Sequence, residues 1–220
     1  MRSQVLLFDL DGTLTDNYAG IAASIRHALM RLGAAEPSDE HLRGCVGPPL
    51  RGTFARLLET VERDVIERAI AHYRERFAEL GWRENVAYPG IEEALRALRT
   101  AGARLMVCTA KPQVYAERIV AHFGFDAHMA AVYGADLAGE LDDKGKLIAH
   151  LLTREAIDPA DATMIGDRAH DIRAAHANRL RAVGVLWGYG TAEELCAADA
   201  LVRTPAELPG AVLRPPQSSA

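Results

Sequence analysis

Residues 5–16 read Val5-Leu6-Leu7-Phe8-Asp9-Leu10-Asp11-Gly12-Thr13-Leu14-Thr15-Asp16. The apolar run at the start of this stretch does not alternate with polar residues, which favours a strand buried on both faces of a parallel sheet. Two carboxylates, Asp9 and Asp11, follow at the carboxyl end of that strand, where parallel sheets bind their ligands. An Asp-Gly pair by itself more often serves only a turn. The rest of the chain therefore decides whether this stretch carries chemistry.

Length and composition favour a globular protein with one large domain. The chain has 220 residues, 49% of them hydrophobic, and a formal net charge of -5. This length suits a core domain that carries a smaller insertion. Acidic and basic residues are interleaved, so no basic face indicates a nucleic-acid partner. No apolar run approaches the ~20 residues of a membrane span, and the first strand begins too early for a signal peptide, so we expect no membrane partner.

The three cysteines, Cys45, Cys108 and Cys196, are widely separated along the chain. An odd number without metal-ligand spacing predicts neither a disulfide framework nor a zinc site. Free thiols are typical of a reducing compartment, so we expect a cytoplasmic protein.

The stretch from about Ala19 to Leu80 reads as helical and interrupts the alternation of strands and helices. Apolar residues recur at helical spacing from Ile21 to Leu32 and from Val65 to Leu80, and a loop rich in Gly and Pro separates the two helices. An insertion at this point would place a helical cap over the carboxyl edge of the sheet. The predicted division is a catalytic core of residues 1–16 and 86–213, a cap segment of residues 17–85 with a hinge at each junction, and a disordered tail, 214–220.

From Tyr88 onward, predicted strands alternate with predicted helices. The strands are expected at 105–109, 130–133, 162–165, 182–186 and 200–202, and helices begin near Ile91, after Pro112, and near Lys144 and Asp171. This alternation predicts an α/β fold, a doubly wound parallel sheet covered by helices on both sides.

Four of the predicted segments bring polar residues to one edge of the sheet. They supply Asp9 and Asp11, then Thr109-Ala110-Lys111, then Lys144, and finally Gly166-Asp167 with Asp171. Carboxylates can hold a hard cation such as Mg2+, and one of them can attack phosphorus. A hydroxyl and an ammonium can stabilise phosphate oxygens in the transition state. The set therefore indicates phosphoryl chemistry.

With these motifs in this order, the chain resembles the haloacid dehalogenase-like (HAD) hydrolase superfamily. Asp9-Leu10-Asp11-Gly12-Thr13 matches the first motif, the strand ending in Thr109 the second, Lys144 the third, and Gly166-Asp167 with Asp171 the fourth. Tyr88-Pro89-Gly90-Ile91 and Thr109-Ala110-Lys111-Pro112 are similar to segments of phosphoglycolate phosphatase-like and nucleotidase-like members. The resemblance covers nearly the whole chain apart from its C-terminal end.

The resemblance implies a Mg2+-dependent phosphomonoester hydrolase with an aspartyl-phosphate intermediate. Asp9 would be the nucleophile, and Asp11 would protonate the leaving oxygen and then deprotonate the attacking water. Thr109 and the Ala110 amide would hold phosphate oxygens. Lys144 would offset the charge between Asp9 and the phosphate.

The resemblance also implies the metal ligands and further contacts to the substrate. Mg2+ would bind the Asp9 carboxylate, the Asp11 backbone carbonyl and Asp167, while Asp171 would orient these ligands or bind through water. The remaining expected contacts come from Gly12 and Thr13, which would shape the turn and offer amides, and from Lys111, which with Lys146 is an alternative to Lys144 for the main phosphate contact.

Arg51 follows the Gly- and Pro-rich loop of the cap segment and could bind a substrate carboxylate; otherwise it is a surface charge on a helix. The expected substrate is a small phosphate ester, with 2-phosphoglycolate first and a nucleoside monophosphate or a sugar phosphate next. The protein could be a monomer or a homodimer.

Other functions remain open to different degrees. A haloacid dehalogenase needs no second aspartate, so Asp11 argues against it, and a phosphonate hydrolase needs a cap lysine that residues 17–86 lack. A sugar phosphomutase would use the same residues and keep its phospho-aspartate away from water. A phosphorelay receiver-like switch is shorter and carries adjacent acids, so the spacing of Asp9 and Asp11 disfavours it.

Overall fold

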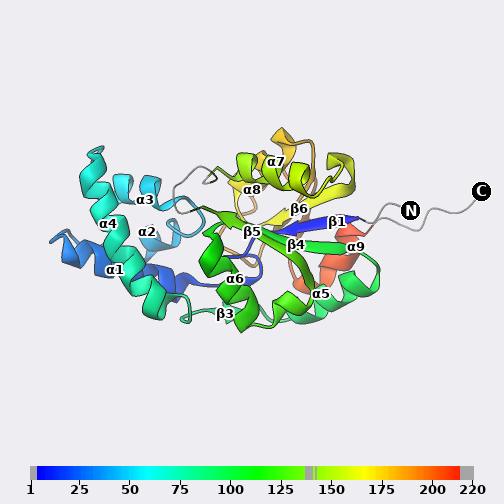
Figure 1. Cartoon of the computed structure of the whole chain (residues 1–220), viewed down its shortest axis with the longest axis horizontal. Helices are drawn as coiled ribbons and strands as arrows, with labels where there is room; N and C mark the ends of the chain where they lie inside the picture. The colour runs from blue at the N-terminus through cyan, green and yellow to red at the C-terminus, as the bar shows by residue number, and fades with distance from the viewer. Residues whose placement is uncertain (1–3, 137–140, 142, 214–220) are drawn as a thin grey trace, which may run out of the picture.

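The computed structural model describes residues 4–136, 141 and 143–213, so the predicted tail at 214–220 lies outside the described residues. Its centre is a six-stranded parallel sheet in the order β5-β4-β1-β6-β7-β8 (Figure 1). The strands are β1 (Val5–Phe8), β4 (Arg104–Pro112), β5 (Met129–Ala135), β6 (Ala162–Gly166), β7 (Arg181–Val185) and β8 (Ala200–Val202).

Strand β1 lies in the middle of the sheet, between β4 and β6, and is buried on both faces. Leu6 and Phe8 pack into the apolar core on one face, whereas Val5 and Leu7 pack into the core on the other. This two-sided burial is why the run shows no alternation. The prediction of a doubly wound parallel α/β fold is confirmed.

Helices cover both faces of the sheet, with α7 and α8 on one side and α5, α6 and α9 on the other (Figure 1). The α-helices are α5 (Ile91–Thr100), α6 (Gln113–His122), α7 (Lys144–Arg154), α8 (Ala169–Ala177) and α9 (Leu208–Val212), and short 3-10 turns are η2 (Phe125–Ala127), η3 (Pro159–Asp161) and η4 (Pro205–Glu207).

Strand β4 is longer than predicted because a bulge interrupts it near its carboxyl end. Its pairing with β5 shifts register between Thr109 and Pro112 and then resumes. Ala110 and Lys111 are the residues in the shifted part. Bulges of this kind turn side chains in a new direction and are common beside active sites.

The cap segment forms a group of helices at one end of the molecule, beyond the carboxyl ends of the strands (Figure 1). It contains α1 (Tyr18–Arg31), α2 (Asp39–Arg43), α3 (Leu50–Leu57), α4 (Arg63–Arg76) and a π-helical turn, η1 (Phe77–Gly81). The chain enters and leaves it through two short strands, β2 (Thr15–Asp16) and β3 (Val86–Ala87), which pair antiparallel with each other.

The helical stripe predicted from Val65 to Leu80 divides into α4 and η1. The rings of Tyr73 and Phe77 stack with their centroids 5.4 Å apart, and Phe77 meets Tyr115 of α6 edge to face at 5.1 Å. Short π-helical turns are frequent at functional sites. Here the turn carries Phe77 from the cap segment onto the core.

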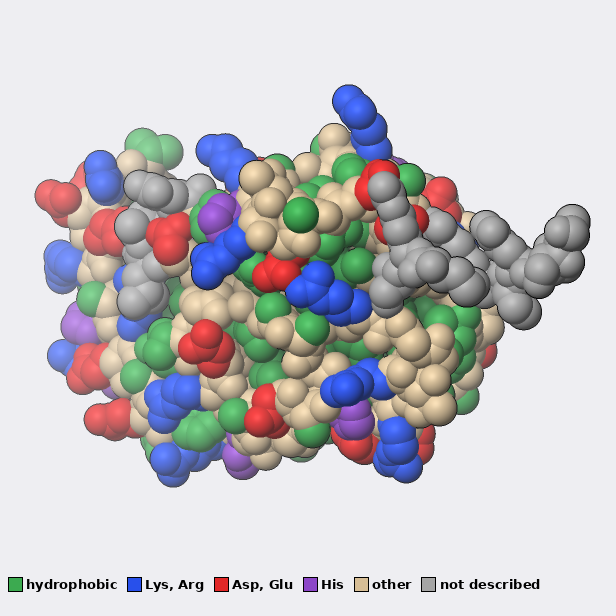
Figure 2. Space-filling model, turned by 45° about the vertical axis from the view of Figure 1, so that its right-hand side comes forward, with side chains coloured by type: hydrophobic (Ala, Val, Ile, Leu, Met, Phe, Trp, Pro, Cys, Tyr) green, Lys and Arg blue, Asp and Glu red, His purple; other side chains and the backbone are tan. Residues whose placement is uncertain are grey.

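The surface carries charges of both signs. Acidic and basic side chains are interspersed over the face shown in Figure 2. Within the described part of the chain, no helix is both long enough and apolar enough to cross a membrane.

Candidate active site

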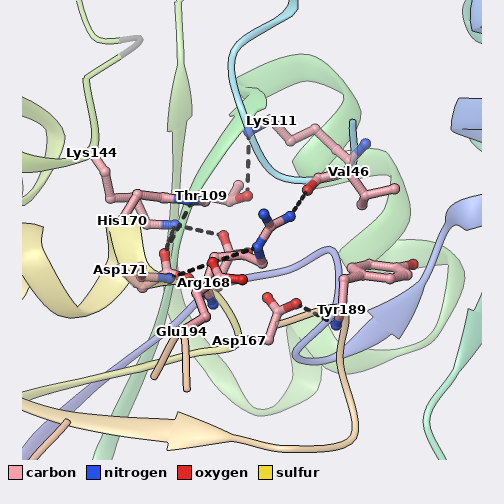
Figure 3. A network of polar contacts seen from close by, with 12 residues as sticks. Val46, Thr109, Lys111, Lys144, Asp167, Arg168, His170, Asp171, Tyr189 and Glu194 are labelled. Atoms are coloured by element: carbon pink, nitrogen blue, oxygen red, sulfur yellow. Dashed lines mark hydrogen bonds and ion pairs between the residues drawn. The ribbon is translucent and has the colours of Figure 1, made fainter. Parts of the chain in front are cut away.

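The carboxyl ends of the central strands bring the predicted polar residues together (Figure 3). Asp9 and Asp11 follow β1, Thr109 lies near the end of β4, and Asp167 follows β6. Lys144, the first residue of α7, is buried beside them. Parallel strands end at one edge of the sheet, so residues distant in sequence meet at one place.

Lys144 is the positive centre of this cluster, with a side chain that is 4% exposed. Its Nζ donates a hydrogen bond to Asp9 Oδ1 at 2.6 Å and lies 2.9 Å from Asp171 Oδ1. Burial alone would lower the pKa of Lys144, but the carboxylates of Asp171 and Asp9 outweigh burial and raise it. Lys144 is therefore a permanent ammonium at this edge of the sheet.

The cluster holds more negative charge than one ammonium neutralises. Burial raises the pKa of Asp9, and Lys144 offsets this only in part. For Asp171, burial acts in the same direction, but Lys144 outweighs it and lowers the pKa. Lys144 therefore lies against both carboxylates, and one ammonium faces two buried anions.

Asp167 is fully buried without a cationic partner in the cluster. Its Oδ2 accepts a hydrogen bond from the Tyr189 backbone N–H at 2.8 Å, while Oδ1 is buried with no hydrogen-bond partner among the described residues. Burial, followed by the charges of Asp171 and Asp9, raises the pKa of Asp167 well above its usual value. A buried carboxylate oxygen without a hydrogen-bond donor could be satisfied by a bound cation.

Three carboxylates offer such a site to a metal ion. Ligand oxygens of Asp9, Asp167 and Asp171 all lie within 4.8 Å of one another. An all-oxygen anionic donor set fits a hard divalent cation. The raised pKa values of Asp9 and Asp167 have the same main cause, burial, to which the neighbouring Asp171 carboxylate adds.

Gly12 allows Asp167 to lie this close to the first motif. Its φ is +91°, and a Cβ built on it would lie 2.2 Å from Asp167 Oδ2. The N–H groups of Gly12 and Thr13 donate to Thr15 and Leu10 carbonyls within the turn. The structure thus places both residues where they shape the turn, with their amides already engaged.

Asp11 lies apart from the three-carboxylate group and pairs with a different cation. Lys111 Nζ is 2.7 Å from Asp11 Oδ2, and both side chains are nearly buried. The bulge in β4 places Lys111 here, and the ammonium also lies 4.5 Å from the centroid of the Phe77 ring. Thr109 accepts the Lys111 N–H through Oγ1 at 3.3 Å. Lys146, by contrast, is exposed on α7.

A cavity opens between these core residues and the cap segment. Its core side includes Asp9, Asp11, Thr109, Ala110, Lys111 and Tyr115, and its cap side includes Ile21, Cys45, Gly47, Pro48, Pro49, Leu50, Tyr73, Arg74 and Phe77. Sequence analysis missed Tyr73 and Phe77, because their helical spacing is equally typical of a packed core, and Arg74, because a single arginine on a helix is usually a surface charge. Arg51 lies on α3, where its Nε donates to Glu67 at 2.7 Å, and it is not one of the residues that line the cavity.

A charged contact joins the cap segment to the core beside Asp167 (Figure 3). Arg168 Nη1 donates to the Val46 carbonyl at 2.5 Å, and its Nε donates to Glu194 at 2.9 Å. A Cβ on Gly47 would lie 3.2 Å from the His170 ring. The loop that carries the cavity-lining residues Gly47 to Leu50 thus rests on the residues that follow Asp167.

The buried carboxylates and ammonium at one edge of this fold are suited to phosphoryl chemistry. Residues 6–185 match the family model described as haloacid dehalogenase-like hydrolase. The chain therefore belongs to this family, and it is an enzyme of the phosphatase type.

The relatives of this chain are named for more than one activity. The chain is 44% identical over 195 residues to a 5'-nucleotidase of Pseudomonas aeruginosa, and the alignment covers 89% of this chain and 88% of that relative. It is 30% identical over 204 residues to a phosphoglycolate phosphatase of Psychrobacter arcticus, and the alignment covers 89% of this chain and 88% of that relative. The solved structure of protein tyrosine kinase A (PtkA) of Mycobacterium tuberculosis superposes with a TM-score of 0.82 at 38% identity, covering 96% of this chain and 98% of that chain.

Proposed function

We propose that the chain is a Mg2+-dependent phosphomonoester hydrolase that works through a phosphorylated Asp9. One observation carries this proposal: Asp9 is paired with Lys144 at 2.6 Å, and its ligand oxygen lies within 4.8 Å of those of Asp167 and Asp171. A carboxylate nucleophile needs an ammonium and a cation beside it, because both the attacking group and the phosphate are anions.

The first half of the reaction transfers the phosphoryl group to the protein. An Asp9 oxygen attacks phosphorus, and the bond from phosphorus to the ester oxygen breaks. Lys144 and the Thr109 hydroxyl would stabilise the charge on the phosphoryl oxygens. The ester oxygen takes a proton from Asp11 and leaves as an alcohol.

The second half returns Asp9 to its starting state. Asp11 takes a proton from a water molecule, and the water oxygen attacks phosphorus. The bond from phosphorus to Asp9 breaks, so inorganic phosphate leaves and the carboxylate is restored.

Lys111 would release Asp11 for these proton transfers when the substrate arrives. Its ammonium pairs with Asp11 at 2.7 Å and lines the cavity. A phosphate dianion that enters the cavity competes for the same ammonium. We infer that Lys111 moves from Asp11 to the phosphate, which couples substrate binding to proton transfer.

Mg2+ would be held by Asp9, Asp167 and the Asp11 backbone carbonyl, with Asp171 orienting this set or binding through water. The partnerless Asp167 Oδ1 and the incompletely compensated Asp9 fit such an ion. The bound ion would neutralise phosphate charge and orient the phosphoryl group.

We further propose residues 1–16 and 86–213 as the catalytic core and residues 17–85 as its cap. The cavity between them is lined by both parts, so closure of the cap would exclude bulk water from the reaction. The three cysteines are free thiols, which supports a cytoplasmic location.

The proposed substrate is a small phosphate ester, with 2-phosphoglycolate first and a nucleoside 5'-monophosphate second. The relative named phosphoglycolate phosphatase supports the first, and the relative named 5'-nucleotidase supports the second. The aromatic rings of Tyr73, Phe77 and Tyr115 in the cavity could also stack on a base.

Phosphate release is the test, measured with 2-phosphoglycolate and with adenosine 5'-monophosphate, in Mg2+ and in excess chelator. We expect release only with Mg2+ and a loss of at least about 1000-fold in kcat for Asp9→Asn. Asp126→Asn, an exposed aspartate on η2, is the control and should keep full activity.

Two results would contradict the proposal. One is Mg2+-independent release, and the other is a folded protein that forms phospho-Asp9 but passes the phosphoryl group to a sugar rather than to water. The second outcome would identify a phosphomutase.

A further inference from the structure

The cap side of the cavity is apolar except at one position. Its aliphatic, proline and aromatic residues are Ile21, Pro48, Pro49, Leu50, Tyr73 and Phe77, together with Cys45 and Gly47. Arg74, the residue after Tyr73 on α4, is the one charged side chain that the described cap residues contribute to the lining. The cap therefore faces the reacting edge with a single cation in an apolar surround.

Arg74 lacks the partner that arginines on neighbouring cap positions have. Its Nε is buried and has no hydrogen-bond partner, and no ion pair involves Arg74 among the described residues. Arg76, two residues further, holds Glu84 through both Nη atoms at 2.7 and 2.8 Å. Arg51 holds Glu67.

A partly buried guanidinium without an anion carries a desolvation cost that an apolar side chain would avoid. The two carboxylates that line the cavity make no ion pair with Arg74 among the described residues: Asp9 contacts Lys144, and Asp11 contacts Lys111. An anion that enters the cavity would relieve this cost. The guanidinium fork suits a carboxylate or a phosphate in a bidentate contact.

We propose that Arg74 binds a second anionic group, carried by the leaving group of the substrate. This inference rests on the proposed phosphatase function, with the transferred phosphate held on the core side by Lys144 and Thr109. The substrate class is then a phosphate ester that carries a carboxylate or another phosphate on its alcohol part. The carboxylate role expected for Arg51 is assigned to Arg74.

This assignment predicts different rates for the two substrates proposed above. 2-Phosphoglycolate presents a carboxylate to the cap, whereas a nucleoside monophosphate presents a neutral sugar and base. The guanidinium in this apolar wall should favour binding of 2-phosphoglycolate and disfavour binding of a nucleoside monophosphate. Discrimination is strongest where the wrong substrate would leave a buried charge unpaired.

Matched substrates test the proposal. 2-Phosphoglycolate is compared with 2-hydroxyethyl phosphate, which has an alcohol in place of the carboxylate, and fructose 1,6-bisphosphate is compared with fructose 6-phosphate. The first pair reports a carboxylate and the second a phosphate. p-Nitrophenyl phosphate measures phosphoryl transfer to Asp9 with a leaving group that carries no second anion.

For the wild type we expect kcat/KM to be at least about 30-fold higher on the anionic member of one pair, the size of one charged contact. Arg74→Ala should remove that preference, mainly through KM, and change p-nitrophenyl phosphate hydrolysis less than about 3-fold. Arg74→Lys should restore part of it. Arg68→Ala, which removes an exposed arginine of the same helix, and Arg51→Ala should leave the preference unchanged.

Stability supplies an independent readout. Arg74→Met replaces an unpaired, partly buried cation with an apolar chain of similar length, so the melting temperature of the ligand-free protein should stay the same or rise. An arginine that merely held the cap together would give a lower melting temperature. 2-Phosphoglycolate should raise the melting temperature of the Asp9→Asn variant more than that of the double variant Asp9→Asn/Arg74→Met.

The outcomes separate this inference from the proposed function. Failure of the wild type to hydrolyse p-nitrophenyl phosphate with Mg2+ would remove the phosphatase function itself. Hydrolysis of that ester without discrimination within either pair would overturn the assignment of Arg74 alone. Loss of the preference in Arg51→Ala instead of Arg74→Ala would overturn it as well.

Discussion

Asp167 illustrates how one side chain can be costly to the fold and useful to the site. It is fully buried, one of its oxygens has no hydrogen-bond partner among the described residues, and burial and two neighbouring aspartates raise its pKa well above its usual value. An unfolded chain would ionise this carboxyl near its ordinary pKa. The metal-free fold must therefore either hold a proton there or bear an uncompensated charge.

Asp167→Asn should stabilise the metal-free protein at neutral pH. Because the pKa of Asp167 is higher in the folded state, the stability that its protonated form contributes is present below the ordinary aspartate pKa and is lost as pH rises. The advantage of the variant, about 1–3 kcal/mol at pH 7, should therefore shrink as pH falls toward 4. Chemical denaturation in chelator at several pH values measures it.

The same substitution should abolish stabilisation by Mg2+, because a carboxylate ligand is lost. The exposed Asp126→Asn should change neither quantity. A variant that is less stable than the wild type in chelator at pH 7, or that still responds fully to Mg2+, would contradict the role of Asp167 as a cation ligand.

At the scale of elements, Tyr189 connects the group of three carboxylates to the entrance of the cap segment. Its backbone N–H donates to Asp167, and its phenolic hydroxyl donates to Asp16 Oδ1 at 2.6 Å. Asp16 ends β2 and pairs with Val86 of β3. The position of the two-stranded ribbon is thus linked to the orientation of Asp167 through a single residue.

Tyr189→Phe should weaken this link while keeping the ring and the backbone contact to Asp167. We expect a loss of about 1–2 kcal/mol in stability, the range for a hydrogen bond to a charged group, together with a lower kcat/KM and a nearly unchanged Mg2+ affinity. Urea unfolding, steady-state kinetics and calorimetric Mg2+ titration measure these quantities.

Tyr133→Phe provides the matched control for Tyr189→Phe. Tyr133 also donates its hydroxyl to a carboxylate, that of Glu155 at 2.5 Å, but it lies on β5 at the edge of the sheet. Equal kinetic effects of the two substitutions would show that the contact to Asp16 has no special connection with the site.

The elements that sequence predicted well are those whose pattern has one physical cause. The unalternating run at Val5 to Phe8 requires two covered faces. Because the ends of parallel strands share an edge, the meeting of Asp9 and Asp167 follows from the fold class. The bulge at Ala110 and Lys111 and the π-helical turn at Phe77 do not, because each depends on packing between distant elements.

At the scale of the whole molecule, the cap and core meet at the contact between Arg168 and the Val46 carbonyl. Arg168 follows Asp167 directly, and Val46 precedes the loop that lines the cavity. Neither partner could be paired from sequence, because a backbone carbonyl carries no identity in the residue pattern. For the same reason, the sequence did not predict that Arg74 lines the cavity, because this depends on which face of α4 is turned toward the core.

Arg168→Ala should loosen the cap from the core. We expect faster amide hydrogen exchange in the loop around residues 44–50 and a KM raised by about 3–10-fold, the effect of losing one charged hydrogen bond that is partly exposed. Hydrogen exchange measured by mass spectrometry, with and without 2-phosphoglycolate, gives the first quantity.

Arg181→Ala is the control for Arg168→Ala, because Arg181 also donates to a backbone carbonyl, that of Ala211 at 2.7 Å, but within the core. It should leave the exchange of the loop and the KM unchanged. Equal protection of residues 44–50 in Arg168→Ala and the wild type would show that the contact does not hold the cap.

The pairing of β2 with β3 also has an evolutionary consequence. Because Thr15 pairs with Ala87 and Asp16 with Val86, the two ends of the segment of residues 17–85 lie side by side, as in a hairpin with an enlarged loop. Lineages can lengthen, shorten or exchange the material beyond that ribbon without breaking a strand of the main sheet. Substrate range can thus diversify through changes at one point of the chain, while the strand ends that carry the proposed catalytic carboxylates stay in place.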